Sequence, residues 1–300
     1  MTLSIAITGA TGLIGHALAQ RLAAAGHRVR SIGRDAPAEV RFDLARDVEL
    51  APHALAGCDA LVHAAGVTDE DFADPAAARA KAGRGASALL ESARRAGVRR
   101  FAYISSAHVY GPLEGRIDES RPPAPRGDYG RAHLATEELF RAAAMDPASA
   151  ALIARPCAAY GMPPSLERFA RWSLIPFDFP RQAIAGRIVL KSHGEQRRNF
   201  VPVEGIANLV GWWLEAAREG VVVANAPGKE EMSVYDFAGL CARIASALTG
   251  RRCEISRPPG VAPQAQPFEY RTRVAGHLPG PSLEEHVARL VRALLQKDAS

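Results

Sequence analysis

The chain has 300 residues, of which 48% are hydrophobic and 23% are charged, as in an ordinary globular protein. Its net charge of +5 comes from scattered arginines, not from a basic stripe with interleaved aromatic residues, so we expect no nucleic-acid partner. No stretch approaches the roughly 20 apolar residues that span a bilayer, and the first apolar run lacks a signal peptide's basic region. The four cysteines lack metal-ligand spacing. We therefore expect a cytoplasmic protein with no membrane contact and no metal site.

Short apolar runs alternate with longer amphipathic runs along the chain. The runs predicted as strands are Leu3–Ile7, Arg28–Ile32, Ala60–His63, Arg100–Ser105 and Ala151–Arg155. The segments predicted as helices are His16–Ala25, Ala76–Ala96, Tyr129–Ala144, Ile206–Ala217, Ser233–Leu248 and Leu283–Leu295. This alternation implies right-handed crossovers. It predicts an α/β fold with a Rossmann-type, doubly wound parallel sheet.

A glycine-rich run, TGATGLIG at residues 8–15, lies between the first predicted strand and the first predicted helix. Gly9, Gly12 and Gly15 stand three apart, a spacing that serves a tight turn, a close approach to a phosphate and helix–strand packing. Free backbone N–H groups and the helix dipole at the helix start favour a pyrophosphate. The run predicts a dinucleotide site in preference to a turn without a ligand.

The sequence changes character after Pro156. Four prolines break up the segment that follows, and we expect irregular structure there; they are Pro163, Pro164, Pro176 and Pro180. We predict a nucleotide-binding domain over residues 1–155, with a return segment near 187–207, and a smaller C-terminal substrate domain over 156–300. The expected site is the cleft between them, outside the carboxyl ends of the strands.

Seven motifs in a fixed order resemble the extended short-chain dehydrogenase/reductases, the NAD(P)-dependent epimerase/dehydratase group that acts mainly on nucleotide sugars. They are TGATGLIG at 8–15, FDL at 42–44, VHAAG at 62–66, SSAHVYG at 105–111, YGRAH at 129–133, RPCAAYG at 155–161 and RRNFVPVEGIA at 197–207. The resemblance covers nearly the whole chain.

The resemblance implies the roles of individual residues. Tyr129 would be the catalytic acid/base, and Ser106 would hydrogen-bond the reacting oxygen. Arg198 would bind the substrate diphosphate through its planar guanidinium, and His108 would lie at the substrate. The residues implied at the cofactor, with Asp43 and Leu44 beside the adenine, are Gly9, Thr11, Gly12, Leu13, Ile14, Gly15, Arg34, Asp43, Leu44, Ala64, Ala65, Gly66, Tyr129, His133 and Pro156.

Three departures from the family pattern fall in the same site. His133 follows Tyr129 by four residues, on the same helix face, where the family has a lysine. That lysine anchors the nicotinamide ribose and lowers the pKa of the tyrosine, whereas an unperturbed histidine, with a pKa near ~6.5, is mostly neutral at pH 7. Ala82 and Ala158 replace two asparagines of the family. His133 remains the third predicted catalytic residue.

Two alternatives therefore stay open. The first is an epimerase or ketoreductase that transfers hydride on a nucleotide sugar or similar substrate. The second is an NADP(H)-binding regulatory or interaction protein with weak or no turnover. Dehydration is less favoured, because Ala107 and His108 stand where dehydratases of this group carry acidic residues. The segments Met162–Gln182 and Arg257–Gly280 would set substrate specificity.

The end of the second predicted strand bears on cofactor choice. Gly33 stands where NAD-preferring members place an acidic residue, and Arg34 can pair with a 2′-phosphate. Asp35 comes one residue later and is expected to face solvent or to cap. We predict NADP in preference to NAD. We also expect a homodimer, since the alanine-rich segments Ala82–Ala96 and Tyr129–Ala144 allow helices to approach closely.

Overall fold

The computed structural model describes residues 1–34, 37–51, 53–216, 219–274 and 280–298, so Asp35, Ala217 and residues 275–279 lie outside it. Within these ranges the central sheet has seven parallel strands in the order β11-β7-β5-β4-β1-β2-β3. They are β1 (Ser4–Thr8), β2 (Arg28–Gly33), β3 (Val40–Arg41), β4 (Ala60–His63), β5 (Arg100–Ile104), β7 (Ala150–Pro156) and β11 (Gly220–Ala226). The predicted doubly wound parallel sheet is confirmed.

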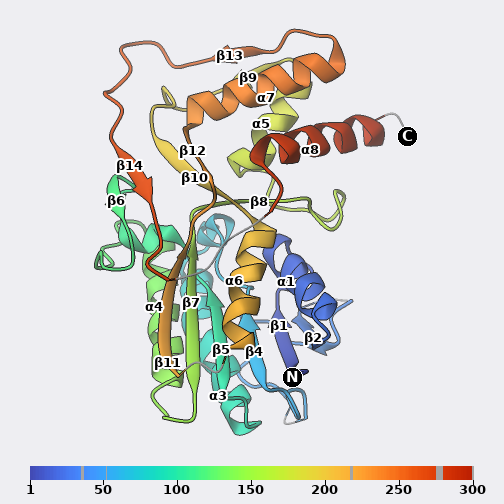
Figure 1. Cartoon of the computed structure of the whole chain (residues 1–300), viewed down its shortest axis with the longest axis vertical. Helices are drawn as coiled ribbons and strands as arrows, with labels where there is room; N and C mark the ends of the chain where they lie inside the picture. The colour runs from blue at the N-terminus through green and yellow to red at the C-terminus, as the bar shows by residue number, and fades with distance from the viewer. Residues whose placement is uncertain (35–36, 52, 217–218, 275–279, 299–300) are drawn as a thin grey trace.

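Helices cover both faces of this sheet. Ile5 and Ile7 face the layer of α1 (Leu13–Ala24) and α6 (Val203–Glu215). The intervening Ala6 faces the layer of α3 (Ala86–Arg95) and α4 (Asp128–Ala143). Successive side chains of a strand point to opposite faces, so a strand buried on both faces is apolar throughout. Figure 1 shows α1 beside α6 on one side of the strands.

A second group of elements lies beyond one end of the sheet (Figure 1). Its helices are α5 (Ile175–Ile184), α7 (Val234–Thr249) and α8 (Leu283–Asp298), and they share one hydrophobic core. Its strands are β8 (Ala158–Tyr160), β9 (Arg187–Val189), β10 (Arg197–Pro202), β12 (Glu230–Ser233) and β13 (Glu254–Ser256). The small pair β6 (Gly115–Ile117) and β14 (Phe268–Tyr270) flanks the sheet. Across the described part of the chain, every helix is too short or too polar to span a bilayer.

The return to the central sheet comes later in the chain than predicted. The strands near 187–207, β9 and β10, pair with β13 and with β8 and β12. Instead α6 packs on α1, and β11 pairs with β7. The β-branched run Val221–Val223 within β11 is the strand signal that the sequence analysis overlooked. The division into domains at residue 156 stays a prediction.

The helix expected over Ala76–Ala96 is divided in three. A π-helical turn, η2 (Lys81–Gly85), separates α2 (Pro75–Ala80) from α3. The Thr136 hydroxyl of α4 donates to the Ala82 carbonyl within this turn (2.9 Å). An α4 side chain thus satisfies a backbone group at the point where the helical hydrogen-bonding pattern changes.

The prediction of irregular structure around the four prolines is wrong in one stretch, because two of these prolines lie within helix α5. Pro176 lies in the first turn, where no helical N–H bond is needed. Pro180 lies inside the helix and cannot donate to the Pro176 carbonyl four residues earlier. Nε2 of His286, on α8, lies 3.3 Å from that carbonyl and replaces the missing donor. A side chain more than a hundred residues away in the sequence thus allows the helix to contain Pro180.

We expect His286→Leu to lower the free energy of unfolding by about 1–3 kcal/mol, because it leaves a buried carbonyl without a donor. In a Pro180→Ala background the same substitution should cost less, since residue 180 then has an N–H to donate. Chemical denaturation of the four proteins measures this double-mutant cycle. An equal cost in both backgrounds would contradict the assignment.

Candidate active site

The glycine-rich run forms a tight turn between β1 and α1. Gly9 has φ +70°, and a Cβ built on it would lie 3.0 Å from the Ala64 carbonyl carbon. A Cβ on Gly15 would lie 2.1 Å from the Gly9 oxygen, so the helix approaches the turn as closely as backbone allows. Gly12 precedes α1 as its N-cap and supplies no side-chain cap. The first backbone N–H groups of α1 are therefore suited to a pyrophosphate.

Thr8 fixes the loop after β4 beside this turn. Its Oγ1 accepts hydrogen bonds from Ala64 N (3.2 Å) and Ala65 N (3.3 Å) and lies 2.8 Å from His63 Nδ1. Burial, with smaller effects from Lys81 and His133, lowers the pKa of His63 to about 3. His63 is therefore neutral, and its Nδ1 accepts from the Thr8 hydroxyl. The loop 64–66 is held against the glycine turn.

The residues expected at the adenine lie at the same carboxyl edge of the sheet. Arg34 directly follows β2 and is exposed. Asp43 Oδ1 accepts from Ala45 N (2.9 Å), and Leu44 is buried. A Cβ on Gly85 would lie 1.9 Å from the Leu44 oxygen, so η2 packs directly on this loop. The structure thus assembles the expected cofactor residues along one edge, although their roles remain predictions.

A cavity of about 710 Å³ contains three of the expected residues, Tyr129, His108 and Arg198. Tyr129 lies in the first turn of α4, edge-to-face with His133 (ring centroids 4.5 Å apart) and with His108 (5.7 Å). The lining comprises His108, Gly111, Pro112, Leu113, Glu114, Arg126, Gly127, Tyr129, Gly130, Glu195, Gln196, Arg197, Arg198, Pro263, Gln264 and Gln266. Its volume suits a small-molecule ligand.

Ser106 and His133 are buried outside this lining. Ser106 precedes the short helix η3 (Ala107–Tyr110), and its Oγ accepts from His108 N (3.2 Å). Its own hydroxyl hydrogen has no acceptor among the residues that the structure describes. The structure therefore places Ser106 beside His108 but not on the cavity wall.

His133 is 3% exposed and lies between the cofactor loop and Tyr129. Burial lowers its pKa to about 3; the Val67 backbone acts in the opposite direction but makes no well-formed hydrogen bond to Nε2. His133 Cε1 would touch a Cβ on Gly66 (3.3 Å). Its buried Nε2 has no hydrogen-bond partner within the described ranges. An unpaired buried nitrogen beside the cofactor loop fits a bound dinucleotide.

Three arginines line the cavity, of which the sequence analysis expected only Arg198. Arg198 donates to the Arg197 carbonyl, and Arg197 donates to the Glu231 carbonyl (both 2.8 Å). Arg126 was missed, although its place three residues before Tyr129, in the loop that leads into α4, is a usable signal. Guanidinium groups are suited to phosphate or carboxylate.

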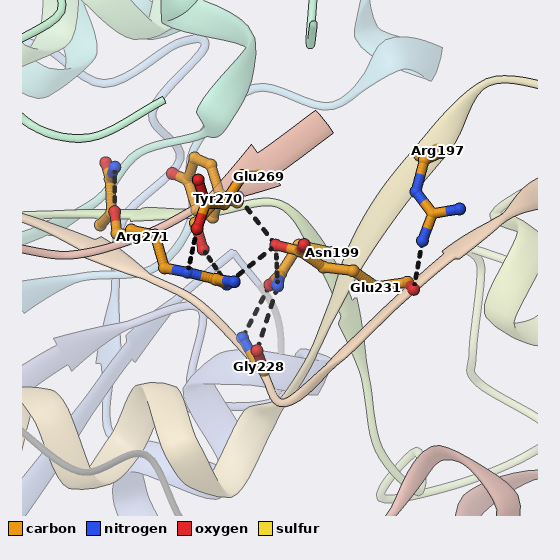
Figure 2. Close-up of polar contacts among 8 residues, drawn as sticks. Arg197, Asn199, Gly228, Glu231, Glu269, Tyr270 and Arg271 are labelled. Carbon is orange, nitrogen blue, oxygen red and sulfur yellow. Dashed lines mark hydrogen bonds and ion pairs between the residues drawn. The ribbon is translucent and has the colours of Figure 1, made fainter. Parts of the chain in front are cut away.

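Asn199 locks the strand that carries Arg197 and Arg198 (Figure 2). Its buried amide accepts from Gly228 N (2.7 Å) and donates to Gly228 O (3.0 Å) and Glu231 Oε1 (3.1 Å). The same Glu231 oxygen accepts from Tyr270 N (2.8 Å) and Arg271 Nη1 (3.3 Å). This cluster joins β10 to β12, to β14 and to the loop after β11, and so fixes the arginines over the cavity.

A buried ion pair, also missed from the sequence, lies between α4 and β7. Arg155 donates to both carboxylate oxygens of Glu137 (2.9 and 2.5 Å). Ser105 Oγ donates to Glu137 Oε1 (2.6 Å). Glu137 lies four residues after His133, so its helix position was available as a signal.

A sequence profile of the NAD dependent epimerase/dehydratase family matches residues 5–225. The chain belongs to this family. It is 40% identical over 104 residues to dTDP-glucose 4,6-dehydratase of Streptomyces niveus, covering 33% of this chain and 30% of that one. It is 34% identical over 155 residues to dTDP-6-deoxy-L-talose 4-dehydrogenase (NAD(P)(+)) of Kitasatospora kifunensis, covering 46% and 47%. The chain thus spans about a third to a half of the length of these curated relatives.

The fold of the family is also found in a solved structure, MoeE5 in complex with UDP-glucose and NAD. Its TM-score with this chain is 0.80 at 22% identity, over 99% of this chain and 100% of that one. At this identity the likeness shows the fold alone.

The buried histidines of this site make the stability of the protein depend on pH. Folding lowers the pKa of His63 and of His133 from 6.5 to about 3, so below pH 6.5 the unfolded chain binds more protons. The free energy of unfolding should therefore fall as the pH drops, by about 2–4 kcal/mol between pH 7 and pH 5. Urea denaturation at both pH values measures it.

His63→Asn is the matched variant, because its amide oxygen can still accept from Thr8 while nothing titrates. The His63→Asn variant should show a smaller change in the free energy of unfolding between pH 7 and pH 5 than the natural protein. A slope identical to that of the natural protein would show that His63 does not contribute.

Proposed function

We propose that the protein is an NAD(P)-dependent epimerase or ketoreductase of nucleotide sugars or similar carbonyl and hydroxyl substrates, with Tyr129 as acid/base. A continuous line of contacts supports this proposal. The glycine turn touches the loop at Ala64, Gly66 of that loop touches His133, and His133 packs against Tyr129 on the wall of the cavity. A dinucleotide on the turn and a substrate in the cavity would therefore meet at Tyr129.

The chemistry divides between the cofactor and the side chains. A nicotinamide dinucleotide held at the glycine turn would supply hydride exchange with the substrate carbon. The Tyr129 hydroxyl gives a proton to the substrate oxygen or takes one from it, and the Ser106 hydroxyl, which donates to no described residue, hydrogen-bonds the same oxygen. His133 is neutral and contributes no positive charge at neutral pH. Proton transfer therefore depends on hydrogen bonding more than on a fixed cation.

Arg126, Arg197 and Arg198 point to a substrate that carries phosphate, since all three line the cavity beside Tyr129. The names of the relatives mention dTDP-sugars, and the solved structure contains UDP-glucose. A nucleoside diphosphate sugar fits both observations. Epimerisation requires the reduced cofactor to be reoxidised by the same substrate molecule. A net reduction instead requires the oxidised cofactor to leave and a reduced one to bind.

For the cofactor we propose NADP over NAD, because Gly33 offers no carboxylate and the exposed Arg34 follows it at the end of β2. We also propose a cytoplasmic homodimer. The exposed side of α4 carries ion pairs, Asp128 with Arg131 and Glu138 with Arg141, so such an interface would be partly polar.

Replacing Tyr129 by Phe should lower turnover about 10²- to 10⁴-fold, because it removes the proton donor, while cofactor affinity stays within a few-fold. A screen of nucleotide sugars, followed by absorbance of the reduced cofactor and by product epimers, measures turnover. Tyr235→Phe, a change in a half-exposed tyrosine outside the cavity lining, is the control. Full activity of Tyr129→Phe would overturn the assignment. A natural protein that binds NADP without turning over any substrate would favour the regulatory alternative.

Replacing Arg34 by Ala should weaken NADP binding about 10-fold and leave NAD binding unchanged, because only NADP loses a charge-assisted hydrogen bond. Calorimetric titration with both cofactors gives the ratio. Arg28→Ala, at the amino end of the same strand, is the control. An unchanged ratio in Arg34→Ala would refute the cofactor preference.

A further inference from the structure

Tyr103 holds the histidine that stands in the position of the family lysine. Tyr103 lies on β5, fully buried, and its hydroxyl oxygen lies 2.7 Å from His133 Nδ1. Its ring stacks against His63 (5.5 Å between centroids) and Phe140 (5.1 Å). Because two rings that also stack on each other pack against it, the Tyr103 ring holds its hydroxyl in a fixed position relative to His133.

The position of the hydrogen in this contact depends on the tautomer of His133. Burial raises the pKa of Tyr103 well above 10, so the hydroxyl keeps its proton. A hydroxyl that keeps its proton can donate it to His133 Nδ1, which lies 2.7 Å away. A neutral histidine that accepts at Nδ1 carries its own hydrogen on Nε2.

No residue that the structure describes accepts that Nε2 hydrogen in good geometry, although the Val67 backbone lies near His133. Nε2 is buried and lacks a hydrogen-bond partner in the described part of the chain. The ring approaches the cofactor loop at Gly66 on one side and Tyr129 on the other. A buried donor is costly to leave unpaired, so its place marks where a ligand acceptor belongs.

We propose that Tyr103 is a positioning residue that locks His133 in its Nε2–H tautomer, so that Nε2 donates to an oxygen of the bound dinucleotide. The proposal rests on the proposed cofactor binding and adds the residue that controls it. A neutral ring with one directed hydrogen thus does what a lysine does with three hydrogens and a charge. Without Tyr103, His133 would distribute its hydrogen between both nitrogens.

Long-range ¹H–¹⁵N spectra of the cofactor-free protein test the tautomer directly, because the two ring nitrogens differ in shift when only one is protonated. His133→Asn identifies the signals of His133 by their loss. We expect the Nε2–H form alone in the natural protein, and a mixture in Tyr103→Phe, which keeps the ring but removes the donor. Tyr160→Phe, which deletes another buried hydroxyl that binds the Pro281 carbonyl, should leave the tautomer unchanged. An Nδ1–H form in the natural protein would overturn the proposal.

Calorimetric titration with NADP tests the consequence. Tyr103→Phe should weaken binding about 3- to 10-fold, the range for one hydrogen bond, and Tyr160→Phe less than about 2-fold. Because Tyr103 acts through His133, Tyr103→Phe should cause no further loss in a His133→Asn background. Additive losses would overturn the proposal, as would a mixed tautomer with unchanged affinity. If the natural protein bound no dinucleotide, the proposed function would be wrong. The spectra of the cofactor-free protein would still determine the tautomer of His133.

Discussion

The buried ion pair between Glu137 and Arg155 is the constraint on which the arrangement of the site depends. It joins α4, which carries Tyr129 and His133, to the end of β7. Ser105, next to Ser106, donates to the same carboxylate. Removing one member of the pair would leave an unpaired charge in the core, which lowers the free energy of unfolding by about 3–5 kcal/mol in comparable pairs. The catalytic helix and the serine turn are therefore fixed against one carboxylate.

The same pair reaches further through aromatic residues. The Arg155 guanidinium lies over the Tyr110 ring (4.7 Å), and the Tyr110 hydroxyl donates to Asn225 of β11. Tyr270 of β14 donates to the Arg155 carbonyl (2.6 Å). Segments far apart in sequence thus meet around Arg155. Loops that line the cavity are therefore attached to this set of paired polar groups.

The features that the sequence predicted are those encoded by near neighbours. The five expected strands lie within a residue or so of their positions, and the glycine turn follows from spacing alone. The four-residue step from Tyr129 to His133 placed both on one face of α4, and their rings are in contact. The family, and with it the sheet, could be recognised in the same way.

The features that the sequence did not predict depend on partners distant in the chain. Tyr103 is thirty residues before His133, and nothing local marks it as the partner of that ring. Arg126 joins Arg198 only because the fold closes a cavity around both. The sequence did not predict α5, because local rules treat the missing N–H of Pro180 as the end of a helix, whereas His286 supplies another donor.

That donor has a consequence for the order of folding. The Pro176 carbonyl in α5 has its donor only once α8, which begins at Leu283, has been synthesised and has docked. Until then the first turns of α5 carry an unpaired carbonyl that only water can satisfy. The core shared by α5, α7 and α8 therefore closes late during synthesis, whereas every strand of the central sheet has already emerged by Ala226. Helix α8 thus completes the hydrogen bonding of a helix made about a hundred residues earlier.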